Sequence, residues 1–203
     1  MLHARSSETQ GGRTTIREVW QSADDPAAER VVVSTGGRRY ETSRGDVYDP
    51  ATNTIYVATE KPSRPRDFEL LAGDPIVQKV RTLLDRGDME VSGPMTHDGT
   101  SAFAIALKST AGRPTWTLWV AAADGKPLEL RDPGRDASEA PQVITWSSYE
   151  VLSGSSAATQ SSLRTAHPDA RVVHDHAQVD AALGRLTGLN TEEIAKRGAT
   201  KTG

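Results

Sequence analysis

Apolar and polar residues alternate with a period of two over much of the first sixty residues of the chain. In TTIREVWQS, for example, Ile16 and Trp20 alternate with Arg17 and Gln21. Runs of this kind, rich in β-branched and aromatic residues and separated by turn formers, are typical of antiparallel strands. The runs that predict strands are residues 14–22, 29–35, 38–43 and 54–58. Gly36-Gly37 lies between two of these runs and predicts a tight hairpin.

The pattern changes to helical spacing in two segments. Residues 74–87 begin with Asp74 as a plausible N-cap and Pro75 in the first turn, and Gly87 is a typical helix end. The second segment, residues 174–188, follows a polar stretch with a weak helix ending near Pro168. The two apolar helix faces consist of Ile76, Val80, Leu83 and Leu84, and of Val179, Ala182, Leu183 and Leu186. Both segments are predicted to pack on a sheet.

Strand patterns resume after the first helix, at residues 88–93, 101–109, 115–121, 126–132 and 142–152. Short strands at this spacing, with few helices between them, indicate a sheet, sandwich or partial barrel and not a parallel α/β fold. The predicted class is therefore α+β, mainly antiparallel β, with short helices.

The tryptophans suggest where an apolar site could lie. Trp116 and Trp119 are three residues apart and should point to opposite faces of one strand, which gives the sheet a second apolar surface. Either a helix covers that surface, or it forms a concave site for a hydrophobic ligand. The candidate groove consists of Phe103, Ile105, Trp116, Leu118, Trp119, Val143 and Trp146.

Composition narrows the function classes. The 203 residues are 36% hydrophobic and 25% charged, with a formal net charge of −3, and the basic residues are scattered. A nucleic-acid partner is therefore not expected, because such binding depends on clustered basic side chains. The chain has no cysteine, which excludes disulfides and thiolate metal sites within it.

Catalytic and metal motifs are weak. His174-Asp175-His176 offers two ligands without a third, His97 and Asp98 lie in a turn, and no sequence pattern connects them. The serine-rich segment 153–156 has no GxSxG arrangement, and no Walker loop or GxGxxG follows a strand. We therefore expect no catalytic residues, no metal and no cofactor, and hence not an enzyme.

The order of several segments resembles the LolA-like superfamily, which includes lipoprotein carriers, mycobacterial lipid-binding lipoproteins and RseB-like sensors of sigma-factor systems. The segments that carry this resemblance are YDPATNTIY, DRGDMEVSG, HDGTSAFAIALKS, TLWVAAADGKPLELRD and ITWSSYEVL. Tyr149-Glu150-Val151-Leu152 and the His167-Pro168 segment are similar to actinobacterial extracytoplasmic domains of unassigned function. These motifs are turns and strand ends, so they inform on fold more than on function.

The resemblance implies an open half-barrel with helices on its concave side, in a non-catalytic, extracytoplasmic domain of the cell envelope. Its ligand would be a lipid or another hydrophobic molecule; the alternative is a protein-interaction or sensor domain of an envelope signalling or sigma-factor regulatory system. The expected organisation is a disordered segment 1–13, a single, N-terminally incomplete LolA-like domain over 14–189, and a flexible tail 190–203. No signal peptide or membrane-spanning run is evident in the sequence, so membrane association would need a segment outside it.

Overall fold

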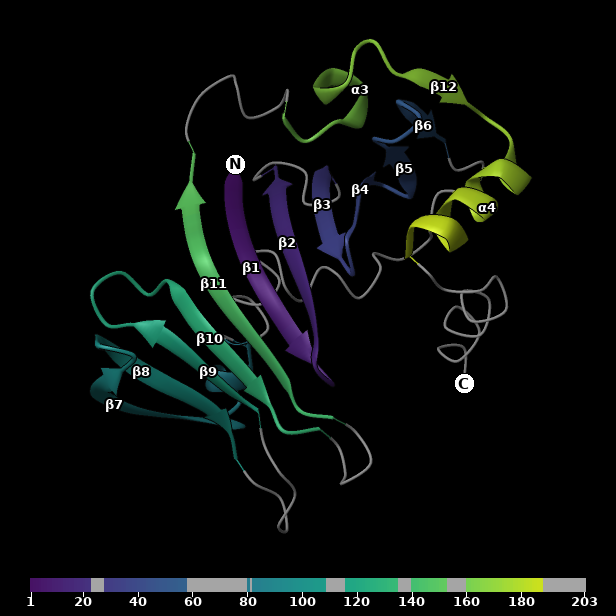
Figure 1. Ribbon diagram of the computed structural model, residues 1–203. Helices are drawn as coiled ribbons and strands as arrows, with labels where there is room; N and C mark the ends of the chain where they lie inside the picture. The colour runs from purple at the N-terminus through teal and green to yellow at the C-terminus, as the bar shows by residue number, and fades with distance from the viewer. Residues whose placement is uncertain are drawn as a thin grey trace. The chain divides into compact units, whose positions relative to one another are not determined.

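The strands of the chain form one open, mostly antiparallel sheet, seen in the computed structural model in Figure 1. The structure describes residues 1–22, 28–57, 80, 82–108, 116–134, 140–152 and 160–187. The strand order is β12-β6-β5-β4-β3-β2-β1-β11-β10-β9-β8-β7, in which β12 pairs with β6 in parallel. The predicted class, mainly antiparallel α+β with an open sheet and a few short helices, is confirmed.

Two compact units make up the chain. The first unit comprises Met1 and residues 19–66 and 152–203, and the second comprises residues 2–18 and 67–151. Each unit has an apolar cluster of its own, one around Ile55 and one around Ile144. The predicted tail 190–203 lies outside the described residues.

The first unit contains a meander of short strands and two helices. Its elements are the end of β2, β3 (Glu29–Thr35), β4 (Arg38–Ser43), β5 (Asp46–Asp49), β6 (Thr54–Tyr56), α3 (Leu163–Ala166), β12 (Arg171–Val173) and α4 (His176–Thr187). Gly36 and Gly37 have φ of 56° and 75°, and Thr35 pairs with Arg38 across them, so the predicted tight hairpin is confirmed. The sequence analysis missed β5, which has only four residues.

The second unit contains the longer strands. Its elements are β1 (Leu2–Gln10), most of β2 (Arg13–Gln21), β7 (Met89–His97), β8 (Thr100–Leu107), β9 (Thr117–Ala121), β10 (Pro127–Asp132) and β11 (Gln142–Val151). The long strands β1 and β11 lie side by side over their whole length (Figure 1), from the pair Leu2–Val151 to the pair Gln10–Gln142.

The N-terminus differs from the sequence prediction, which expected residues 1–13 to be disordered. Residues Leu2–Gln10 form β1, and Gly11 and Gly12, with φ of 56° and 76°, turn the chain into β2. The inward-facing residues of β1 include Ala4 and Ser6, both buried. These small and polar side chains give no hydrophobic alternation, so β1 is evident only from its pairing with β11.

Both predicted helices are present where the structure describes them. Val80 and residues 82–85 are helical, and the segment ends at Gly87, whose φ is 73° and whose N–H donates to the Leu84 carbonyl at 2.9 Å. In α4 the four predicted apolar residues, Val179, Ala182, Leu183 and Leu186, are all buried. Among the described residues, no helix combines the length and hydropathy that crossing a membrane requires.

Candidate functional site

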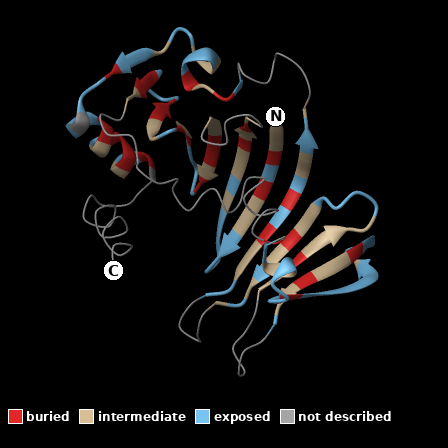
Figure 2. Cartoon of the chain, turned by 180° about the vertical axis from the view of Figure 1, so that it is seen from behind, coloured by how far each residue is buried: buried red, intermediate tan, exposed pale blue. Residues whose placement is uncertain are grey.

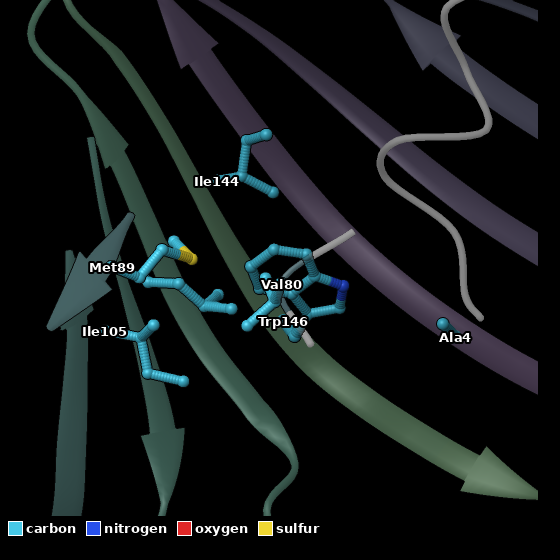
Figure 3. Packing of buried hydrophobic residues seen from close by; sticks show 7 residues of the cluster. Ala4, Val80, Met89, Ile105, Ile144 and Trp146 are labelled. Atoms are coloured by element: carbon cyan, nitrogen blue, oxygen red, sulfur yellow. The ribbon is translucent and has the colours of Figure 1, made fainter. Parts of the chain in front are cut away.

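An apolar cluster covers one face of the second unit's sheet. We call apolar cluster the buried residues Ala4, Val80, Met89, Ile105, Leu118, Ile144 and Trp146, with the partly buried Leu83, Leu84, Leu107, Trp116, Val120, Leu130 and Tyr149 packed against them. Figure 3 shows Val80, from the helical segment, beside Trp146 of β11, with Met89 and Ile105 close by. A helix therefore covers part of this face, and the large apolar side chains packed against the buried residues remain partly exposed.

Strand register determines which side chains share this face. Ile105 pairs with Leu118, Leu118 with Leu130, and Leu130 with Ile144, so these four residues form a row across β8, β9, β10 and β11. Cross-strand neighbours point to the same side of a sheet, and alternate residues along a strand return to that side. This row is the base on which the helical segment packs.

The structure brings five of the seven predicted groove residues to this face. Ile105, Leu118 and Trp146 are buried in the apolar cluster, and Trp116 packs against it. Phe103 pairs with Val120 and is two residues from Ile105, which places it on the same face. Trp119 and Val143 lie on the other face, since they pair with Glu129 and Arg131 respectively. The opposite orientation predicted for Trp116 and Trp119 is thus confirmed.

The opposite face of the same strands carries charged and aromatic side chains. The ring of Trp119 stacks on the ring of His97, with centroids 4.2 Å apart and an angle of 6° between the planes. Glu129, next to Trp119 in register, forms an ion pair with Arg131. The small residues Ala102 and Ala104 lie on this face of β8, where Ala104 pairs with Trp119.

The first unit holds a buried carboxylate. Asp49 is 0% exposed and accepts hydrogen bonds from the Ala51 backbone N–H at 2.9 Å, from Thr52 Oγ1 at 3.1 Å and from Arg185 Nη2 at 2.7 Å. Burial raises the pKa of Asp49, but hydrogen bonds from Arg185, Ala51 and Thr52 outweigh it, so the net pKa is below its ordinary value. The hydrogen bond to Asp49 likewise raises the pKa of Arg185. Asp49 therefore closes the turn after β5 and attaches α4 to it.

A second buried carboxylate, Glu41 of β4, belongs to the same unit. Arg30 Nη1 donates to Glu41 Oε2 at 3.3 Å, and His167 Nε2 lies 2.9 Å from the same oxygen. The His167 ring stacks on Tyr48 with centroids 3.6 Å apart. Burial and the nearby Glu41 and Asp49 raise the pKa of Tyr48. These contacts join β4 and β5 to the segment after α3, which is a structural role.

Sequence reasoning did not find these polar sets. His97 and Trp119 belong to different hairpins, and Asp49 and Arg185 lie far apart along the chain, so no spacing rule relates the members of either pair. A local signal did exist for Asp49, because the sequence Asp49-Pro50-Ala51-Thr52 is typical of a turn closed by an Asp side chain.

No protein-family model matches the chain, and no curated protein matches it. Solved structures similar to it include an uncharacterized conserved protein from Thermus thermophilus, with 14% identity and a TM-score of 0.43, covering 86% of this chain and 90% of that one. A second is the Pseudomonas aeruginosa MucA/MucB complex, at 14% identity and a TM-score of 0.41, covering 77% of this chain and 54% of that one. A LolA superfamily protein from Nitrosomonas europaea has 8% identity and a TM-score of 0.26, covering 76% and 86%. In each case the sequence identity and the TM-score are low.

Proposed function

We propose that the chain is a non-catalytic extracytoplasmic binding domain that holds a lipid-like molecule against the apolar cluster. The observation that carries this proposal is the set of partly buried large apolar side chains packed against the apolar cluster, including Trp116, Leu107 and Leu130. Burying apolar area contributes about 25 cal/mol per Å², so an acyl chain laid against these side chains would be bound without any polar contact. The extracytoplasmic location rests on the sequence resemblance.

The two tryptophans of the 116–119 segment provide a matched test. Trp116 packs against the apolar cluster, and Trp119 stacks on His97 on the opposite face. Titration with a fluorescent fatty acid should show saturable binding to the wild type. Trp116→Ala should weaken that binding about tenfold, the effect of losing roughly 1.4 kcal/mol of apolar contact. Trp119→Ala should leave it within about twofold, because the ring lies on the other face.

Both variants must be folded for this comparison, which far-UV circular dichroism and thermal unfolding establish. Equal loss in the two variants would contradict the assignment of the ligand to the clustered face. Absence of uptake by the folded wild type would reject the lipid-binding function.

A second function, a protein-interaction domain of an envelope signalling system, is favoured by the edge strand β7. This strand ends the sheet order, and all but its two terminal residues are exposed, as the pale blue of Figure 2 shows. Val91 is 52% exposed on it, and Met95 is exposed as well. An exposed strand edge with apolar side chains can pair with an added strand from a partner. If fatty-acid uptake is absent, this function would be supported by a protein partner that binds the wild type and does not bind the Val91→Lys variant.

A further inference from the structure

Three side chains of types that can ligate a metal meet on the face of the second unit's sheet opposite the apolar cluster. His97 ends β7, Asp98 follows it in the turn, and Glu129 lies in β10. One ligand atom from each lies within 4.8 Å of the other two. His97 Nε2 is 3.7 Å from Glu129 Oε1 and 3.9 Å from Asp98 Oδ2. The sequence analysis expected no metal, because the strand pairing that brings Glu129 to His97 was not visible in it.

The environment of His97 Nε2 is unusual for a polar atom. The His97 side chain is only 10% exposed, and this nitrogen is buried without a hydrogen-bond partner among the described residues. A buried polar atom left unpaired costs about 1–3 kcal/mol, and such an atom needs an explanation, of which a missing ion is one. The stack on Trp119 fixes the ring plane, so Nε2 is held toward the two carboxylates.

We propose that His97, Asp98 and Glu129 form a binding site for a divalent transition-metal ion, with Zn²⁺ as the best-fitting probe. One imidazole nitrogen and two carboxylate oxygens suit Zn²⁺. Ligand atoms about 2.0–2.1 Å from a tetrahedral Zn²⁺ are separated by about 3.4 Å. The two distances from His97 Nε2 exceed that by only a few tenths of an ångström. Asp98 is 83% exposed, so ions can enter from its side and water can complete the coordination.

Arg131 competes with the ion for the carboxylate of Glu129. Its Nε pairs with Glu129 Oε1, the same oxygen that faces His97 Nε2. The Arg131 side chain is 60% exposed and is able to move into solvent when the ion binds. The metal therefore competes with the guanidinium for one carboxylate, and removing that guanidinium should strengthen metal binding.

The test is titration of the metal-free, untagged full chain with Zn²⁺ by isothermal calorimetry at neutral pH, together with thermal unfolding with and without Zn²⁺. The wild type should bind one ion and unfold at a higher temperature with it. His97→Gln and Glu129→Gln should each weaken binding at least tenfold, of the order seen for metal-site substitutions. Arg131→Met should tighten binding several-fold.

The matched control is His174→Gln, which removes another histidine adjacent to an aspartate, His174 beside Asp175, and should leave Zn²⁺ affinity unchanged. No binding by the folded wild type at millimolar Zn²⁺ would overturn the proposal. Equal binding by wild type and His97→Gln would overturn it as well, since the ion would then lie elsewhere. Circular dichroism confirms that each variant is folded. If the His97 and Glu129 variants fail to fold, Arg131→Met still decides the test. Weaker Zn²⁺ binding by Arg131→Met would contradict the competition between the ion and the guanidinium for Glu129.

Discussion

Replacing Asp49 tests how the first unit attaches α4 to its sheet. Asp49→Ala removes two local hydrogen bonds, worth about 1 kcal/mol each, and a charge-assisted bond from Arg185, worth about 1.5–3 kcal/mol. The Arg185 side chain is 51% exposed, so its charge returns to water and adds no further cost. We expect a loss of about 3–5 kcal/mol in the free energy of unfolding of this unit.

The Asp49→Asn variant separates the contribution of the carboxylate charge from that of the hydrogen bond that closes the turn. The amide oxygen still accepts the Ala51 hydrogen bond, so the expected loss is smaller, about 1–2 kcal/mol at pH 7. The pKa of Asp49 in the folded chain is below its ordinary value. The carboxylate therefore stabilises the fold above the unfolded-state pKa of about 3.9, and this contribution disappears as the pH falls through the folded-state pKa. The difference between wild type and Asp49→Asn should stay constant down to about pH 5 and narrow below about pH 4.

Urea unfolding followed by circular dichroism, with hydrogen exchange of the α4 amides, measures these changes. Hydrogen exchange is needed because a chain of two units need not unfold in one step. Two results would refute the role given to this carboxylate. One is a difference in unfolding free energy between wild type and Asp49→Asn that is unchanged at about pH 3. The other is an unfolding free energy of Asp49→Ala within about 1 kcal/mol of wild type.

Three further substitutions, with Gly99→Ala as a control for one of them, test the second unit by urea unfolding. Ile144→Ala, at a site that is 1% exposed, should cost about 2–5 kcal/mol, and a cost below about 1 kcal/mol would contradict the packing of the apolar cluster. Gly93→Ala should cost about 2 kcal/mol or more, because φ is +119° and the added Cβ would lie 2.9 Å from the Ala102 carbonyl oxygen. Gly99→Ala, with positive φ but open space, is its control and should cost about 1 kcal/mol. Val151→Lys, at an exposed strand end, should change stability by less than about 0.5 kcal/mol, and a larger loss would mean a buried contact there.

Much of the fold could be predicted from period-two alternation and turn residues. The strands around Val31–Val33, Phe103 and Trp146, the hairpin at Gly36-Gly37 and the helix end at Gly87 all follow from local sequence. The strand β1 was missed because its buried positions carry Ala4 and Ser6. Its one local signal was the Gly11-Gly12 turn, which the sequence analysis attributed to disorder.

The candidate sites could be predicted from the sequence only where their residues lie on one strand. Trp116 and Trp119 were correctly placed on opposite faces because the period of a strand is two. Val143 was grouped with Trp146 although the two are an odd number of positions apart, and the sheet places them on opposite faces. Glu129 could not be related to His97, because that contact depends on the register of four strands.

The central claim, that the apolar cluster holds a hydrophobic molecule, is tested most directly by native mass spectrometry of the gently purified protein, followed by solvent extraction. We expect a bound apolar molecule at near one-to-one ratio in the wild type and in Trp119→Ala, and its loss in Trp116→Ala. A wild-type mass with no bound molecule, together with no uptake of added fatty acid, would contradict the claim and favour the protein-interaction domain.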